Sequence, residues 1–156
     1  SQIAKLAKLM RYMLYETDTN FVPISREIEY LENYIELQKL RFSETDDVHI
    51  ILDWGNKDSN YPIAPFILLP FIENAFKFGI SLQNKSTITI SIQHESNLFR
   101  FTVSNTIHKH IKHDTFGGIG LQNLKKRLRL LYPDNHLLDI QKKDESYTAI
   151  LELQNG

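Results

Sequence analysis

Three polar side chains interrupt the apolar stretch between Pro65 and Ile80. Glu73, Asn74 and Lys77 fall on one predicted helix, and Asn74 and Lys77 share a face because residues three apart are neighbours on a helix. The amide oxygen of Asn74 is a hard ligand, and Mg²⁺ commonly takes one or two protein oxygens besides water and substrate phosphates. The pattern therefore indicates a metal and phosphate site. The same spacing also allows a simpler arrangement, an exposed Asn74 beside a Glu73–Lys77 ion pair.

A cluster of glycines opens directly into a basic amphipathic segment. Gly117, Gly118 and Gly120 lead into a helix predicted over residues 119–132, with basic residues at 125–127. Glycines let backbone N–H groups approach a polyphosphate closely, and a helix N-terminus adds partial positive charge. A flexible turn followed by a solvated basic helix face remains the alternative. Together with the first segment, the cluster suggests a metal-bound nucleotide held between a helix and a loop.

A polar region follows the strand predicted over residues 98–103. Asn105 at its end could hydrogen-bond a base edge, because a carboxamide both donates and accepts, or it could simply terminate the strand in a turn. His108, His110 and His113 come next, in a predicted mobile loop. No cysteine and no paired-histidine motif elsewhere completes a metal site around them, so the sequence does not favour a histidine-bound metal.

Composition limits the class of protein. The 156 residues suffice for one domain, or for one domain with a helical appendage, and 42% hydrophobic content supports a core. With 18 basic and 19 acidic residues the net charge is −1, which gives no support for nucleic-acid binding. The absence of cysteine excludes a disulfide scaffold. No apolar run is long enough for a membrane span, and the start within a helical pattern suggests a fragment of a longer protein.

Hydrophobic periodicity predicts two helices followed by an α+β unit. The first helix, over residues 3–16, carries an apolar seam that needs a partner, and the second follows Ser25, the expected N-cap, and extends to Phe42. The remaining predicted elements are a strand at 48–54, a helix at 65–80, strands at 87–92 and 98–103 joined by a turn at 94–97, the helix at 119–132, and a hairpin at 137–140 and 147–153. A mixed sheet of about five strands with helices on one face is expected.

These segments together closely resemble sensor histidine kinases of the LytS type, whose ATP-binding domain belongs to the GHKL superfamily. Residues 9–16 resemble the second helix of the dimerisation region, and residues 27–42 resemble a distinctive connector of the family. Residues 69–77 are similar to the N box and residues 118–128 to the second glycine box. The resemblance covers nearly the whole chain.

The resemblance implies a Bergerat-type α/β sandwich over residues 45–156, preceded by partial dimerisation and connector helices in 1–44. By the same resemblance Asn74 would hold Mg²⁺, and Lys77 would contact phosphate of the bound ATP. Asn105 would face the adenine, and residues 106–117 would form the ATP lid. The phosphate side would be lined by Gly117, Gly118, Gly120 and Leu121. Glu73 and Lys77 are the candidate catalytic residues. Lys77 would help to neutralise charge, and Glu73 would either polarise the attacking imidazole or only pair with Lys77.

The family assignment also predicts partners and a location. The implied activity is a protein-histidine kinase that moves the γ-phosphoryl of Mg·ATP to a histidine upstream of this chain, and then to a response regulator. A homodimer is expected for the full kinase, as the cytoplasmic part of an inner- or plasma-membrane protein. Two departures, Asn105 in place of an aspartate and Phe78 in place of a histidine, favour an alternative: a degenerate, non-catalytic GHKL module that transmits conformation.

Overall fold

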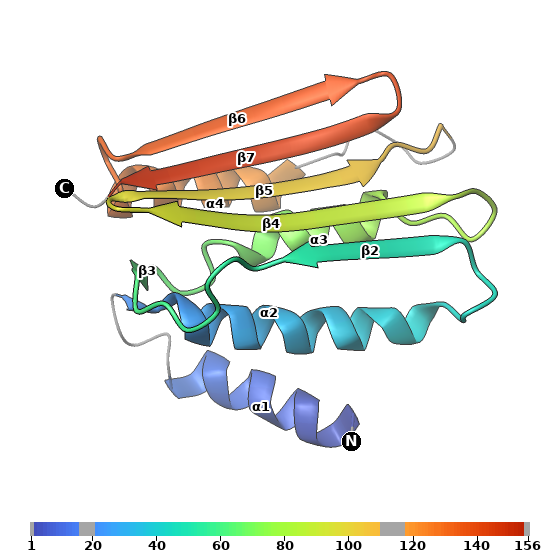
Figure 1. Ribbon diagram of the computed structural model, residues 1–156, viewed down its shortest axis with the longest axis horizontal. Helices are drawn as coiled ribbons and strands as arrows, with labels where there is room; N and C mark the ends of the chain where they lie inside the picture. The colour runs from blue at the N-terminus through green and yellow to red at the C-terminus, as the bar shows by residue number, and fades with distance from the viewer. Residues whose placement is uncertain (1, 16–20, 110–117, 155–156) are drawn as a thin grey trace.

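The computed structural model describes residues 2–15, 21–109 and 118–154 and shows a five-stranded sheet flanked by helices (Figure 1). The helices are α1 (Gln2–Tyr15), α2 (Ile24–Gln38), a short 3₁₀ helix (Lys39–Arg41), α3 (Leu69–Phe78) and α4 (Gly118–Leu131). The strands are β1 (Val22–Pro23), β2 (Val48–Asp53), β3 (Pro62–Ile63), β4 (Ser86–Glu95), β5 (Leu98–Thr106), β6 (His136–Lys143) and β7 (Ser146–Gln154). The large sheet has the order β2-β4-β5-β7-β6.

The sheet is mixed, as the sequence predicts. β2 pairs with β4 in parallel, and every other neighbouring pair in it is antiparallel. Alternate residues of each central strand are buried, because successive side chains point to opposite faces. The buried set includes Ile88, Ile90 and Ile92 of β4 and Phe99, Phe101 and Val103 of β5. This apolar face forms the core.

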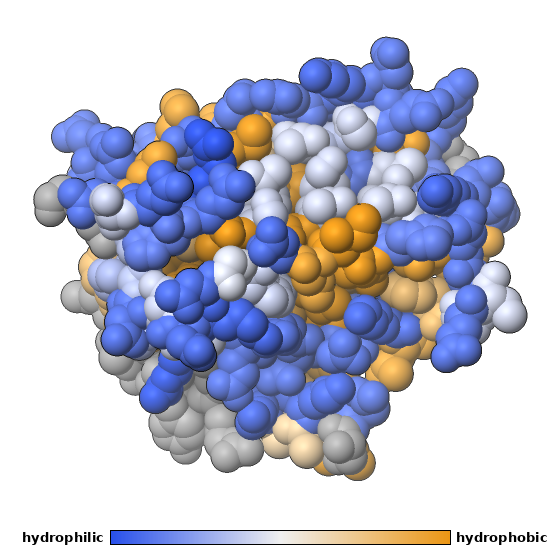
Figure 2. Space-filling model, viewed as in Figure 1, coloured by the Kyte–Doolittle hydropathy of each residue, from blue (hydrophilic) through white to orange (hydrophobic). Residues whose placement is uncertain are grey.

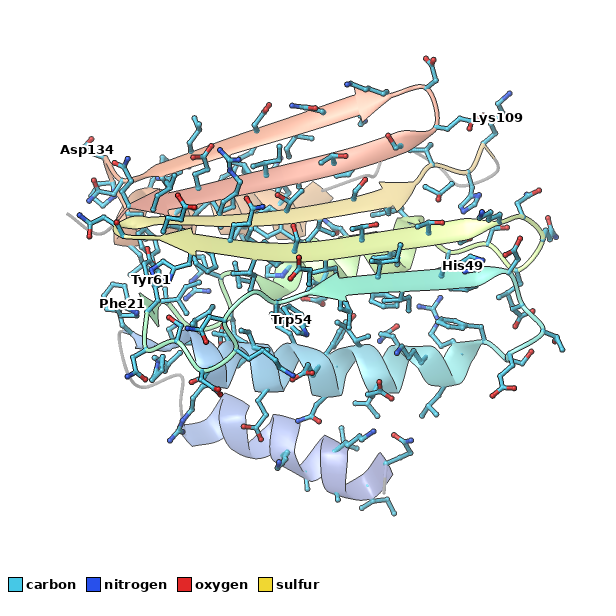
Figure 3. The ribbon with its side chains drawn as sticks, in the orientation of Figure 1. Phe21, His49, Trp54, Tyr61, Lys109 and Asp134 are labelled. Carbon is cyan, nitrogen blue, oxygen red and sulfur yellow. The ribbon has the colours of Figure 1, made fainter. Side chains whose placement is uncertain are left out.

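Helices α3 and α4 cover that face, and α2 completes the core beside β2 (Figure 1). Phe71 of α3 packs edge-to-face on Phe101 of β5, with ring centroids 5.8 Å apart. Tyr34 of α2 packs in the same manner on Phe76 of α3, at 6.2 Å. Trp54, buried at the end of β2, lies between the sheet and α2 (Figure 3). The prediction of an α+β fold with helices on one face is therefore confirmed.

The opposite face of the sheet is turned toward the viewer in Figure 2, where side chains of intermediate hydropathy border an apolar patch and hydrophilic side chains surround both. Its partly exposed residues include the hydroxyl side chains of Thr89, Ser91 and Thr102, with Ile51 half-exposed beside them. A two-sided sheet of this kind explains the strict alternation seen in the sequence. None of the helices in the part of the chain that the structure describes is long and apolar enough to cross a membrane.

Three predicted boundaries were wrong. Ser25 is not the N-cap: α2 begins at Ile24 after Pro23, and no side chain caps it. α3 begins at Leu69 instead of Pro65, because Phe66 has a φ of 62° and lies in the left-handed region, which interrupts a helix.

The turn between the two central strands is also shorter than predicted. β4 continues through Glu95, and β5 starts at Leu98, so only residues 96–97 form the turn. The small β1–β3 pair had no signal in the sequence, since each strand has two residues. Asn105, predicted at a strand end or turn, belongs to β5 itself.

Candidate nucleotide and phosphotransfer site

Helix α3 presents the three polar residues that the sequence singled out. Its buried side, which includes Ile72, Ala75 and Phe76, fixes the helix on the core, so Glu73 and Lys77 face outward and Asn74 is half-buried. No ion pair joins Glu73 to Lys77 within the described residues, although their spacing allows one. The simpler interpretation of this segment, an i,i+4 ion pair, is therefore wrong.

The carboxamide of Asn74 makes no hydrogen bond to any described residue. A half-buried amide without a protein partner retains its carbonyl oxygen for a ligand, and an oxygen is the donor that Mg²⁺ prefers. The Lys77 ammonium lies over the ring of Phe78, 5.1 Å from the ring centroid. Asn74 and Lys77 thus fit a site for a metal and phosphate.

Asn105 lies directly against the C-terminal end of α3. A Cβ built on Gly79, the residue that follows α3, would come 2.6 Å from the Cβ of Asn105 and 2.5 Å from the carbonyl oxygen of Ala75. Only a glycine permits so close an approach of helix and strand. Asn105 is 3% exposed, and its Nδ2 donates to the Thr106 carbonyl oxygen at 2.9 Å. Its Oδ1 has no partner among the described residues and can accept from an amino group.

The first residues of the predicted lid are anchored. The backbone N–H of Ile107 donates to the Glu145 carbonyl oxygen at 2.9 Å. His108 is buried, with its Nε2 3.1 Å from the Gly79 carbonyl oxygen and 3.0 Å from Ser86 Oγ. His108 therefore joins the start of the lid to the end of α3. His110 and His113 lie outside the described residues, and among those described no group of histidines and carboxylates could hold a metal.

The N-terminus of α4 supplies the glycines of the second predicted segment. Gly118 and Gly120 lie in its first turn, and Leu121 packs against the core, while Gly117 lies outside the described residues. A Cβ on Gly120 would meet no described atom within 4 Å. Because neither packing nor a positive φ requires glycine there, the open space beside Gly120 fits a ligand that approaches the backbone.

A second feature, which sequence reasoning missed, holds the segment before α3. The Ala64 N–H donates to Tyr132 Oη at 3.0 Å, and the Phe66 N–H donates to Glu27 Oε1 at 2.8 Å. Arg127 Nη2 donates to the Pro65 carbonyl oxygen at 2.9 Å. Residues of α2 and of α4 and its C-terminal end therefore hold residues 64–66, the segment that leads into α3. The sequence allows Arg127 to belong to a solvated basic helix face, but its contact with Pro65 leaves it half-buried.

The electrostatics are shaped by partial burial. Loss of solvent raises the pKa of Glu73 above its usual 4.5, although the side chain retains considerable exposure. Burial, reinforced by the Glu73 charge, raises the pKa of Tyr34 to about 12. These groups line a pocket of about 270 Å³ between α2 and α3. A larger cavity of about 500 Å³ lies at the Leu98 end of β5, far from Asn105, and none of the predicted site residues lines it.

The known proteins that this chain is similar to are histidine kinases. The family model "Histidine kinase" matches residues 1–45. The sensor histidine kinase BtsS of Escherichia coli is 27% identical over 133 residues, covering 85% of this chain and 23% of that protein. The sensor protein LytS of Oceanobacillus iheyensis is 27% identical over 160 residues, covering 92% of this chain and 27% of that protein. This chain thus spans about a quarter of the length of these relatives.

Solved structures agree on the fold. The histidine kinase AdeS of Acinetobacter baumannii superimposes with a TM-score of 0.61 at 10% identity, covering 97% of this chain and 76% of that one. The full-length kinase ShkA, solved in complex with AMPPNP, gives 0.60 at 13% identity, covering 97% of this chain and 35% of that one. At such identities the likeness concerns the fold alone. The family match, the sequence relatives and the fold point the same way: this chain is similar to sensor histidine kinases, the sensor protein LytS among them.

Proposed function

We propose that this chain is the ATP-binding catalytic portion of a two-component sensor histidine kinase. In this proposal residues 45–156 bind Mg·ATP, and residues 1–44 are part of the dimerisation and connector region. The phosphoryl group passes to a histidine outside this chain and then to a response regulator. The full kinase is proposed to be a membrane-anchored homodimer with this portion in the cytoplasm.

One observation carries the proposal most directly. α3 bears Asn74 and Lys77, neither with an acidic partner among the described residues, and its C-terminal end packs on Asn105 through Gly79. A candidate metal ligand, a phosphate-binding cation and a candidate base-recognising amide are thereby fixed on one rigid unit. The unpacked backbone at Gly120 supports the phosphate side of the same site.

Each residue has a distinct part. Asn74 offers its carbonyl oxygen to Mg²⁺, and Lys77 offsets the negative charge of phosphate oxygens. Asn105 accepts from the adenine amino group through Oδ1. The backbone of Gly117, Gly118, Gly120 and Leu121 is proposed to line the phosphates, where a helix N-terminus favours negative charge.

The catalytic contribution of the protein is mainly positioning and charge neutralisation, as in other phosphoryl transfers. When bound, Mg·ATP supplies the transferable phosphoryl group and the metal charge that screens it. Glu73 is proposed to accept a hydrogen bond from the attacking imidazole. Its raised pKa reduces the fraction of the carboxylate available at mildly acidic pH.

The test is calorimetric titration of this chain with AMPPNP, with and without Mg²⁺, in the wild type and in Asn74→Ala. The expected result is Mg²⁺-dependent binding that is weakened at least tenfold, about 1.4 kcal/mol, in the variant. Asn97→Ala is the matched control, because Asn97 is exposed at the turn between β4 and β5, at the far end of β5 from Asn105.

Two outcomes would contradict the proposal. A folded wild type that does not bind millimolar AMPPNP would instead support the alternative, a degenerate module that transmits conformation. Equal losses in Asn74→Ala and Asn97→Ala would remove Asn74 from the site. Phe78 gives the alternative its structural basis, because it is buried at the position where the family has a histidine.

A further inference from the structure

The pocket of about 270 Å³ between α2 and α3 is lined by residues of both helices and of the 3₁₀ helix that follows α2. From α3 come Glu73, Phe76 and Lys77, and from the other side come Tyr34, Gln38 and Arg41. The edge-to-face contact between the Tyr34 and Phe76 rings joins the two helices there. The connector helix therefore contributes half of a pocket whose other half contains two proposed catalytic residues.

Arg41 has no acidic partner among the described residues, unlike the lysines that pair with the acids of α2. Lys8 pairs with Glu29 at 2.8 Å. The other ion pairs of α2 acids among the described residues include Lys57–Glu32 at 3.0 Å, Lys39–Glu36 at 3.3 Å and Lys5–Glu36 at 3.7 Å. Arg41 Nη1 instead donates to the neutral Gln38 Oε1 at 2.9 Å, and the guanidinium makes no ion pair with any described residue.

This arrangement holds the guanidinium without neutralising it. A guanidinium has five N–H donors, and only one of them is used by Gln38. The pocket carries a formal net charge of about +1, because Arg41 and Lys77 are positive and Glu73 is its one acidic residue. Burial and the Glu73 charge raise the pKa of Tyr34, and the Arg41 charge lowers it. Tyr34, Glu73 and Arg41 therefore face a common space. A planar fork of donors with unsatisfied positive charge suits a phosphate group.

We propose that Arg41 binds the terminal phosphoryl group of the nucleotide, acting with Lys77 from the opposite side of the pocket. This inference rests on the proposed nucleotide site, and it adds a phosphate-binding residue from the connector, outside the segments that resemble the N box and the glycine box. Since Arg41 lies in the 3₁₀ helix that follows α2, the connector would contact the nucleotide only when the terminal phosphoryl group is present.

The test compares AMPPNP with ADP in the presence of Mg²⁺, by calorimetric titration of the whole chain. Arg41→Gln removes the charge, and Arg41→Lys keeps the charge but loses the fork. Lys39→Gln is the control, because Lys39 lies in the same 3₁₀ helix and is paired with Glu36 instead of lining the pocket. Thermal unfolding followed by circular dichroism checks that each variant is folded.

The expected result is a loss of affinity of about tenfold or more for AMPPNP in Arg41→Gln, the size of one charge-assisted hydrogen bond. The affinity for ADP is expected to stay within about twofold, because ADP lacks the group that Arg41 contacts. Arg41→Lys should fall between the wild type and Arg41→Gln, and Lys39→Gln should leave both affinities unchanged.

The proposal is overturned if Arg41→Gln and Arg41→Lys keep the wild-type ratio of the AMPPNP and ADP dissociation constants. It is also overturned if Lys39→Gln reproduces the change, since a general surface potential would then explain it. A wild type that binds neither nucleotide would refute this inference together with the proposed function. A wild type that binds both, with an unaltered ratio in the Arg41 variants, would refute only the role of Arg41.

Discussion

The contact between Gly79 and Asn105 makes a sharp prediction about stability. In Gly79→Ala the new Cβ would lie 2.6 Å from Asn105 Cβ and 2.5 Å from the Ala75 carbonyl oxygen. Unstrained carbon atoms are separated by about 3.5–4.0 Å, so either α3 or the end of β5 must move by about 1 Å. The backbone itself is not an obstacle, because Gly79 has a φ of −97°, which alanine readily adopts.

The expected cost follows from the rigidity of the two neighbours. Overpacking of a core generally costs about 1–3 kcal/mol. Both atoms here belong to, or are attached directly to, the backbone of a helix or a strand, so neither can rotate away. We therefore expect a loss near the upper end, about 2–3 kcal/mol of the free energy of unfolding. For a chain of this size that lowers the melting temperature by about 4–12 °C.

Gly120→Ala is the matched control and should change stability in the opposite direction. Gly120 lies in α4, and a Cβ there meets no described atom within 4 Å. Replacing a helical glycine with alanine stabilises by roughly 0.5–1 kcal/mol. If the nucleotide phosphates approach this backbone, the same variant should bind AMPPNP more weakly while unfolding at a higher temperature.

Urea unfolding followed by circular dichroism measures both variants. The m-values should match that of the wild type, so that the midpoints report stability. A Gly79→Ala protein as stable as the wild type would refute the reasoning, because the helix and strand could then not be in the contact described. If both variants were more stable than the wild type, conformational entropy, and not the contact at Asn105, would dominate the effect of Gly79→Ala.

The remaining predictions concern two buried tyrosines and one carboxylate. Tyr132→Phe should lower the free energy of unfolding by about 1–3 kcal/mol in urea titrations, because the Ala64 N–H loses its acceptor. Tyr61→Phe should instead be neutral or stabilising by up to about 1 kcal/mol, because the buried Tyr61 hydroxyl has no partner among the described residues; a large loss would contradict this. Glu73 has a raised pKa, so the folded state binds more protons than the unfolded state just above pH 4.5, and its contribution to stability falls as pH rises through that window. Glu73→Gln should therefore flatten the dependence of stability on pH there, and an unchanged slope would refute the shift.

Much of the fold was predictable because its signals are local. The strict alternation in residues 87–92 predicted a half-buried strand, and the structure confirms it as the centre of β4. The apolar periodicity of the segment after Leu69 predicted a helix that buries one side. The mixed sheet of five strands followed from the number and order of such segments, and it is confirmed.

Boundaries were less predictable because distant contacts decide them. The sequence between Pro65 and Leu68 reads as the first turn of α3, and it is apolar enough to be one. The structure interrupts the helix there, since Phe66 adopts a left-handed conformation while Glu27 from α2 accepts its N–H. A local sequence pattern cannot predict a hydrogen bond between residues that are 39 positions apart in the chain.

The candidate site divides in the same way. The residue types and spacing of Glu73, Asn74 and Lys77, and the glycines before α4, were enough to predict a metal and phosphate site. They could not decide whether Glu73 pairs with Lys77, and they gave no reason to connect Arg41 with either residue. Those relations depend on the packing of α2 against α3, which brings residues far apart in sequence to one pocket.

The sequence by itself therefore determined the chemistry available to this protein and the elements that carry it, because residue type and hydrophobic period are local properties. Only the tertiary structure decided which polar groups remain without a protein partner and which face one another. Asn105 illustrates the difference: as a residue it could end a strand or recognise a base. Asn105 packs against Gly79, and its Oδ1 has no partner among the described residues, because helix α3 and strand β5 meet at a point where any side chain larger than that of glycine would keep them apart.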